Sequence, residues 1–274
     1  MTGTLATAGL DLDARYAAAK EIASEAAQRG MAYYRRREEL TVMQKSADAT
    51  DLVSIADREL EDYIRAELTR RFPDDGLLGE ERGASDLDAH CLWVIDPIDG
   101  TACFVNGLHN WCVSIGLLVN GQPTLGAIAD PNHNELFHAR LGHGAFVNDA
   151  PLQASTATEL NQGAVGVGTT SRPGKEHFLP FFGKLLEAGG MFYRGGSGAL
   201  TTAYVAAGRL LAYHETRLYA WDCVAGMVMV HEAGGRTSSF LRGNALTDGG
   251  PFLAACPGVY DTVHEMVGAW IDTE

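Results

Sequence analysis

The stretch Asp96-Pro97-Ile98-Asp99-Gly100-Thr101 decides how the rest of this chain is interpreted. It follows Leu92 to Ile95, an apolar run typical of a buried strand, so its carboxylates are expected at a strand end. The proline has a fixed φ, which stiffens the backbone between the two aspartates. Two held carboxylates, with the Ile98 carbonyl between them, offer the oxygen ligands that Mg²⁺ prefers.

The last two residues of the hexapeptide suit an anion. Gly100 lets the backbone approach an anion closely, and a helix that begins at Gly100 and Thr101 points its free N–H groups and positive dipole end at a phosphate. The alternative for the hexapeptide alone is a surface turn, because Asp, Pro and Gly are common in turns.

Two further acidic motifs accompany the hexapeptide. Gly79-Glu80-Glu81 precedes it and Trp221-Asp222 follows it, each beside an apolar segment that can bring a carboxylate to the same strand end. Taken singly, the glutamate pair is typical of a solvated turn and the aspartate of a helix N-cap. Only the combination of the three motifs predicts a shared site.

Together, these motifs resemble the signature of the inositol monophosphatase family, in which D-P-I-D-G-T stands between an upstream G-E-E and a downstream W-D-x-x-A-G. All three occur here in that order, the last as Trp221 to Gly226, and the resemblance runs from about Leu40 to Gly235. It implies an α/β fold, a layered αβαβα sandwich of the inositol monophosphatase and fructose-1,6-bisphosphatase type.

The resemblance also implies a site for two or three Mg²⁺ ions. The implied metal ligands are Glu80, Asp96, the carbonyl of Ile98, Asp99 and Asp222. Thr101 and Glu80 inherit the role of orienting the attacking water, and the family places an acidic residue at Asp57 and a lysine at Lys45 near the metals.

The substrate side is also implied by the family. The residues that match its substrate contacts are Asp99, Gly100, Thr101, Ser197, Gly198, Ala199, Glu215 and Asp222. The carboxylate of Glu215 suits polyol hydroxyls, whereas the glycine-rich turn at 197–199 has the alternative of simple helix entry. Cys103 and Tyr219 depart from residues common in inositol-cleaving relatives, and Arg194 can meet an anionic substrate or a structural ion pair.

Phosphoryl transfer to water needs an oriented nucleophile and neutralised phosphate oxygens, and metal ions can serve both needs. We therefore predict Mg²⁺-dependent hydrolysis of inositol monophosphate or a similar polyol phosphate. Histidinol phosphate, fructose 1,6-bisphosphate and 3'-phosphoadenosine nucleotides are alternative substrates within the resemblance. A regulatory role in protein interaction is the alternative from another class, and lithium sensitivity and a homodimer are implied family traits.

Composition limits the partners. The 274 residues carry 21 Lys and Arg against 35 Asp and Glu, a net charge of −14, and no long basic run, which disfavours nucleic acid as the main ligand. An acidic protein that handles phosphate needs a local cation. The five cysteines show no C-x-x-C spacing, and no run approaches the roughly 20 apolar residues that cross a bilayer. We expect a cytoplasmic protein without membrane partners.

Hydrophobic patterning predicts alternating helices and strands. Before residue 150 we expect a helix over 12–37, a second helix that Pro73 stops, and an antiparallel meander over 112–139. After it we expect strands at 164–167, 211–215 and 252–255 and helices at 178–187, 198–207, 221–233 and 260–271. We divide the chain into an N-terminal α+β half, residues 1–150, which carries most metal ligands, and a C-terminal α/β half, residues 151–274, which closes the substrate cleft.

Overall fold

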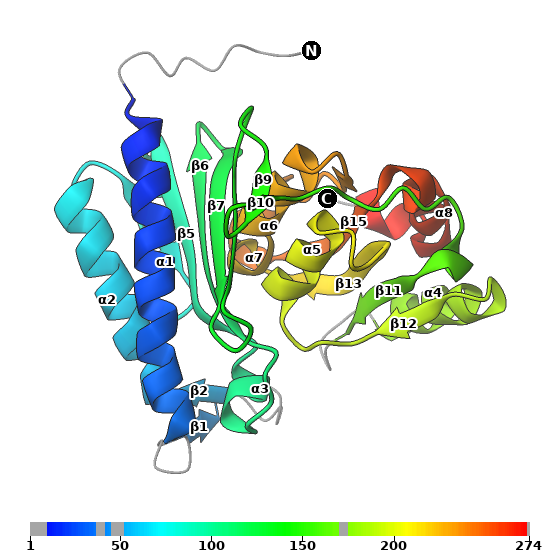
Figure 1. Ribbon diagram of the computed structural model, residues 1–274, viewed down its shortest axis with the longest axis horizontal. Coiled ribbons are helices and arrows are strands. Elements are labelled where there is room, and N and C mark those ends of the chain that lie inside the picture. The colour runs from blue at the N-terminus through cyan, green and yellow to red at the C-terminus, as the bar shows by residue number, and fades with distance from the viewer. Residues whose placement is uncertain (1–9, 37–41, 45–51, 170–174, 273–274) are drawn as a thin grey trace.

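The computed structural model describes residues 10–36, 42–44, 52–169 and 175–272, and its elements are arranged in five layers (Figure 1). Two long helices cover one face of an eight-stranded sheet, α5 and α6 lie between this sheet and a five-stranded sheet, and α4 and α8 cover the outer face of the second sheet. The predicted αβαβα arrangement is confirmed.

The helices are α1 (Leu12–Arg35), α2 (Ile55–Arg71), α3 (Thr101–Val105), α4 (Lys175–Glu187), α5 (Gly198–Ala206), α6 (Ala220–Glu232), α7 (Ala245–Asp248) and α8 (Pro257–Val267), with short 3₁₀ turns at Leu160–Gln162 and Ala269–Asp272. Asp11 caps α1 by accepting the N–H of Ala14 at 2.8 Å. The helix predicted to stop at Pro73 ends at Arg71.

The eight-stranded sheet has the order β10-β9-β8-β7-β6-β5-β3-β4. Its strands are β3 (Gly76–Gly79), β4 (Gly83–Ser85), β5 (Cys91–Asp99), β6 (Cys112–Val119), β7 (Gln122–Asp130), β8 (Glu135–Arg140), β9 (Ala145–Val147) and β10 (Ala150–Pro151). The predicted meander is β6 to β8. All nine residues of β5 are buried, because helices cover both faces of the sheet at this strand.

The five-stranded sheet has the order β12-β11-β13-β15-β14. Its strands are β11 (Ala164–Gly168), β12 (Met191–Tyr193), β13 (Ala212–Leu218), β14 (Arg236–Thr237) and β15 (Gly250–Ala255), and a separate pair is formed by β1 (Val42–Gln44) and β2 (Leu52–Ser54). β13 extends beyond the predicted 211–215 because it continues past an irregularity in its pairing with β15 between Glu215 and Leu218.

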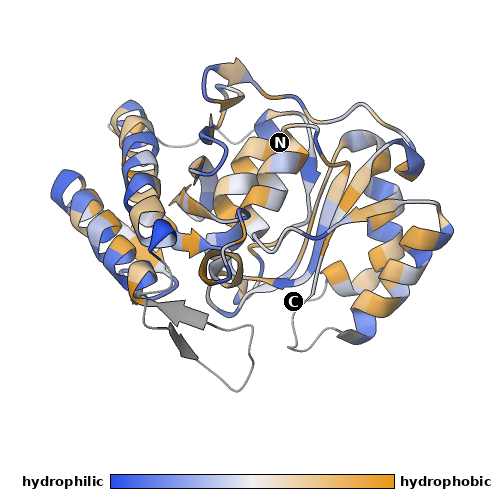
Figure 2. Ribbon diagram, turned by 60° about the horizontal axis from the view of Figure 1, so that its bottom comes forward, coloured by the Kyte–Doolittle hydropathy of each residue, from blue (hydrophilic) through white to orange (hydrophobic). Residues whose placement is uncertain are grey.

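The hydrophobic core is continuous across the middle layers. Apolar residues of β5 to β9 share one buried cluster with those of α5, α6 and the second sheet, and a further cluster fills the space under α1 and α2. Hydrophobic colour gathers on the inner elements, whereas the outward sides of the two long N-terminal helices are hydrophilic (Figure 2). The outer helices therefore bury one face, as amphipathic surface helices do, whereas α5 and α6 are covered by a sheet on each side.

The division near residue 150 remains our proposal. It is supported by the sheets, since all strands from 76 to 151 pair in the first and all strands from 164 to 255 pair in the second. The predicted boundary itself lies in a β9–β10 hairpin, where Asn148 has a φ of 51°. α6 packs on the first sheet, so the two halves share a core.

The last predicted helix differs in its bounds from the expected 260–271. It begins earlier, because Pro257 suits the first turn after the extended residue Cys256, and it ends at Val267, because Gly268 adopts a φ of 81°. Among the residues that the structure describes, every helix is too short or too polar to cross a lipid bilayer.

Candidate active site

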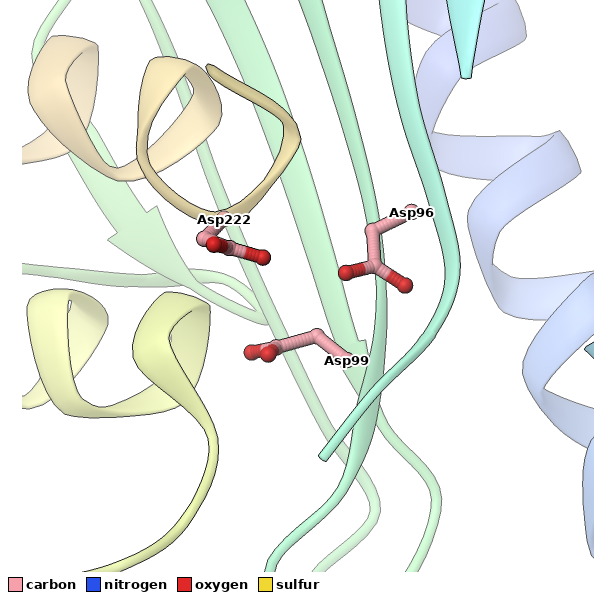
Figure 3. A group of neighbouring side chains, drawn as sticks. All are labelled: Asp96, Asp99 and Asp222. Carbon is pink, nitrogen blue, oxygen red and sulfur yellow. The ribbon is translucent and has the colours of Figure 1, made fainter. Parts of the chain in front are cut away.

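Three aspartates from two distant parts of the chain converge between the layers. Asp96 and Asp99 end β5, Asp222 stands in the first turn of α6, and one carboxylate oxygen of each lies within 4.8 Å of the others. Figure 3 shows the three side chains pointing into a common space. Three carboxylates placed in this way can hold a divalent cation.

An irregularity in β5 lets both of its aspartates face this space. Residues three apart in a regular strand point to opposite faces of the sheet. Asp96 pairs with Ser114 and Asp99 with Cys112, so three steps along β5 match only two along β6. This extra residue lies in a segment where Pro97 has no N–H for the sheet. It brings the side chain of Asp99 to the same face of the strand as that of Asp96.

The cluster gathers negative charge. Burial, and then the charges of Glu80 and Asp99, raise the pKa of Asp96 well above its ordinary value, and burial with the same two charges raises the pKa of Asp222. Neither carboxylate makes an ion pair with an arginine or lysine in the described part of the chain. The oxygen-only donor set fits Mg²⁺, Mn²⁺ or Ca²⁺ better than Zn²⁺ or Cu²⁺.

Asp99 is also tied to the start of α5. Its carboxylate accepts the N–H groups of Ala199 at 2.7 Å and Gly198 at 3.2 Å, and the hydroxyl of Ser197. Burial raises the pKa of Asp99, whereas these hydrogen bonds to the charged form oppose the rise. The glycine-rich turn therefore holds a predicted metal ligand, whether or not it also contacts substrate.

Glu80 and Asp57 lie beside the three aspartates. Glu80 follows directly after β3 and lines the cleft described below, and its charge acts on both Asp96 and Asp222. Asp57, in the first turn of α2, is fully buried, and its charge also raises the pKa of Asp96. The structure thus brings both predicted acidic residues to the cluster.

Thr101 begins α3 directly after Gly100, as the sequence predicts. Gly100 has a φ of 93°, a conformation that favours glycine, and α3 is only five residues long. The Thr101 hydroxyl lies 3.0 Å from the Ile98 carbonyl oxygen and 3.4 Å from Asp57 Oδ1, and its proton can go to either. Lys45 lies outside the described residues.

A cleft of about 420 Å³ opens beside the cluster. Its lining includes Glu80, Asp99, Gly100, Thr101, Cys103, Arg194, Ser197, Gly198, Glu215, Arg217, Tyr219 and Asp222. Most residues predicted for metal and substrate therefore face one cavity. Asp96 is 1% exposed and Ala199 fully buried, and both lie behind the lining.

Glu215, on β13, is a further carboxylate that lines the cleft. Burial raises its pKa to about 7, although the Tyr213 hydroxyl donates to it and the charge of Arg194 favours the ionised form. Arg194 donates to the Thr169 carbonyl at 3.4 Å and makes no ion pair with any residue that the structure describes. Glu215 can accept hydroxyl groups, and Arg194 brings a positive charge to the same end.

Cys103 and Tyr219, the two residues that depart from those common in inositol-cleaving relatives, also face the cleft. Cys103 donates to the Gly195 carbonyl at 3.4 Å, and Tyr219 stacks on Trp221 with ring centroids 4.8 Å apart. Cys103, like the other four cysteines, is free and buried. Asp222 is not the N-cap of α6, which is Tyr219. It is the third residue of the helix, where its carboxylate accepts the Tyr219 N–H at 2.8 Å and still faces the cluster.

One residue of the site neighbourhood was missed from the sequence. Glu61 of α2 is fully buried and accepts the N–H groups that directly follow Glu80 in the chain. The position of Glu61 in the sequence could have indicated its burial, because Asp57, Ile64 and Leu68 lie on the same face of the helix. A glutamate that is buried there needs a partner for its charge.

Comparisons with known proteins agree with the geometry. The model of the "Inositol monophosphatase family" matches residues 11–266. A Nus factor SuhB of Xylella fastidiosa is 41% identical over 218 residues, 78% of this chain and 78% of that protein. An inositol-1-monophosphatase of Mesorhizobium japonicum is 41% identical over 209 residues, 74% of this chain and 78% of that protein.

The crystal structure of the extragenic suppressor protein SuhB from Bartonella henselae superposes with a TM-score of 0.86 at 31% identity, and the match covers 93% of this chain and 98% of that one. Sequence and fold therefore agree along almost the whole chain. This protein belongs to the inositol monophosphatase family.

Proposed function

We propose that this protein is a Mg²⁺-dependent phosphatase that hydrolyses a small phosphate monoester, with inositol monophosphate or a similar polyol phosphate as substrate. The observation that carries the proposal is the cluster of the buried Asp96 and Asp99 with the partly exposed Asp222, beside a cleft of about 420 Å³. Three close carboxylates without a cationic partner among the described residues favour a bound divalent cation.

Each group of the site has a definite task in this proposal. Glu80, Asp96, Asp99, Asp222 and the Ile98 carbonyl hold two or three Mg²⁺ ions, which supply charge neutralisation at the phosphate and acidify water. Thr101 and Glu80 orient the attacking water. The N–H groups of Gly100 and Thr101 receive phosphate oxygens at the start of α3.

Glu215 supports a polyol as the leaving alcohol. Its carboxylate lies in the cleft and, when ionised, accepts hydrogen bonds from hydroxyl groups. The relative named inositol-1-monophosphatase supports the same substrate class. Because Cys103, Tyr219 and Arg194 line the same cleft, histidinol phosphate, fructose 1,6-bisphosphate and 3'-phosphoadenosine nucleotides remain the competing substrates.

A panel of these phosphate esters at a fixed Mg²⁺ concentration tests the proposal. Release of inorganic phosphate should be fastest from inositol 1-phosphate, and Asp96→Asn should abolish it. No release from any ester would reject the enzymatic role, and a clear preference for a competing ester would change the substrate assignment. The same assay with LiCl, and light scattering of the purified protein, test the proposed lithium sensitivity and homodimer.

A regulatory role is the second candidate, and it is favoured by relatives named Nus factor SuhB, including one 38% identical over 247 residues. The intact set of acidic residues instead favours catalysis, because a purely interacting protein has no need to keep buried carboxylates together. Retention of a transcription or ribosomal complex by an inactive Asp99→Asn variant would support the regulatory role. Lack of retention would leave the enzyme alone.

A further inference from the structure

Helix α2 holds the turn that contains Glu80. The carboxylate of Glu61 accepts the N–H of Glu81 at 2.7 Å and the N–H of Arg82 at 3.1 Å. Glu61 is fully buried, so these contacts are made away from solvent. Hydrogen bonds from backbone N–H groups to a buried carboxylate are among the stronger ones in proteins.

Arg65, one helical turn after Glu61, binds both the Glu61 carboxylate and the turn. Its Nε donates to Glu61 Oε1 at 2.6 Å, which balances the buried negative charge. Another of its nitrogens donates to the carbonyl of Gly83 at the far end of the same turn. The pair Glu61 and Arg65 therefore binds both the donors and the acceptor of residues 81–83.

Gly79, the residue before Glu80, lies close to the carboxylate of Glu61. A Cβ atom placed on Gly79 would lie 2.2 Å from Glu61 Oε1, so a side chain at this position would displace the carboxylate. The N–H of Glu80 itself donates to the Ile95 carbonyl of β5 at 3.3 Å. Glu80 is thus fixed by β5 at its own amide and by Glu61 at the next two amides.

We propose that Glu61 is a positioning residue for the metal site, which fixes the turn so that the Glu80 side chain reaches the aspartate cluster. The inference rests on the proposed function, because it takes Glu80 as a ligand of Mg²⁺. The hydrogen bonds of Glu61 go to Arg65 and to the backbone of Glu81 and Arg82. Glu61 acts through the backbone of residues 80–82, as partners that orient metal ligands do.

The test is direct binding of Mg²⁺, measured by isothermal titration calorimetry on the full chain. In Glu61→Gln one acceptor oxygen is replaced by an NH₂ group, which meets a backbone N–H or Arg65 as a second donor. We expect the affinity for Mg²⁺ to fall about tenfold or more. The control is Glu67→Gln on the same helix, whose partners Arg70 and Arg71 lie away from the turn, and it should bind Mg²⁺ as the wild type does.

Three further outcomes separate the possibilities. If folded Glu61→Gln binds Mg²⁺ as tightly as the wild type, the inference is wrong while the proposed function stands. If the wild type itself binds no Mg²⁺, the metal site and the inference both fail. If Glu61→Gln does not fold by circular dichroism, Arg65→Gln decides: reduced Mg²⁺ affinity supports the inference, and unchanged affinity overturns it.

Discussion

The carboxylate of Asp99, at the end of β5, accepts the N–H of Ala199 at 2.7 Å, although the two residues are one hundred positions apart in the chain. This contact joins the aspartate cluster to the first turn of α5, and through it the first sheet to the layer that faces the second sheet. Changes at the cluster are therefore expected to act on the stability of the fold as well as on catalysis.

Asp96 and Asp99 should differ in their effect on stability. In Asp96→Asn the Oδ1 that accepts the Ile98 N–H at 3.0 Å is kept, while a buried charge among like charges is removed. We therefore expect the free energy of unfolding of the metal-free protein to rise, because the repulsion between buried like charges is removed.

Asp99→Asn relieves the same repulsion but turns an NH₂ group towards donors at the start of α5. Each hydrogen bond lost there costs about 1 kcal/mol, so its gain in stability should be smaller than that of Asp96→Asn, or absent. Urea unfolding in the presence of a chelator compares the two. An equal or larger gain for Asp99→Asn would contradict the role assigned to its hydrogen bonds.

Mg²⁺ should stabilise the protein more at alkaline than at acidic pH. The folded-state pKa values of Asp96, Asp99 and Asp222 are raised above 3.8, so the unfolded chain loses these protons first. The cluster's contribution to the stability of the metal-free protein therefore begins to fall at a pH of about 4. It stops falling once these carboxyls have also ionised in the folded protein. Bound Mg²⁺ reverses the loss, because it binds the ionised form.

Thermal unfolding at pH 5 and pH 8, with a chelator or with Mg²⁺, measures this difference. Asp96→Asn is the matched control, since it should show a weaker pH dependence and a smaller Mg²⁺ effect. A Mg²⁺-induced rise in Tm that is the same at both pH values, or is unchanged in the variant, would argue against the cluster as the metal site.

Glu215 should make substrate binding depend on pH near neutrality. Its pKa of about 7 means that it gains its charge as pH rises through that value, and only the ionised carboxylate accepts hydroxyl groups with both oxygens. The KM for inositol 1-phosphate should therefore fall between pH 6 and pH 8. Glu215→Gln lacks this ionisable group, so the part of the pH dependence of KM that comes from Glu215 should be absent in the variant. The KM profile of the variant then gives the effect of the titration of the substrate phosphate alone.

Should wild type and Glu215→Gln show the same KM profile, Glu215 does not bind the alcohol. Its pKa also has a consequence for stability. The folded pKa lies above the ordinary value of 4.5, so the contribution of Glu215 to stability falls as pH rises from about 4.5 to about 7.

Much of the fold could be predicted because its signals are local. α1, α2 and the meander β6 to β8 follow from helical spacing, Pro73 and apolar runs separated by turns. β3 carries a weaker signal, since Gly76-Leu77-Leu78-Gly79 has no β-branched or aromatic side chain. It becomes a strand because β5 and β4 pair with it on both sides.

The site was predicted less completely, because its geometry depends on contacts between distant segments. The motifs name the acidic residues, but they do not show that Asp99 binds the N–H groups of α5. Nor do they show that Glu61 is buried, since this depends on where the turn after β3 lies relative to α2. Both contacts are set by the packing of layers.

The most direct test of the central claim is Mg²⁺-dependent release of phosphate from inositol 1-phosphate by wild type and Asp222→Asn. Asp222 links α6 to the cluster, and its side chain still accepts the Tyr219 N–H after the change, so the fold should be kept. We predict release that requires Mg²⁺ in the wild type and a loss of about a thousandfold or more in the variant. Equal release by both proteins, or release by the wild type without a divalent cation, would contradict the claim.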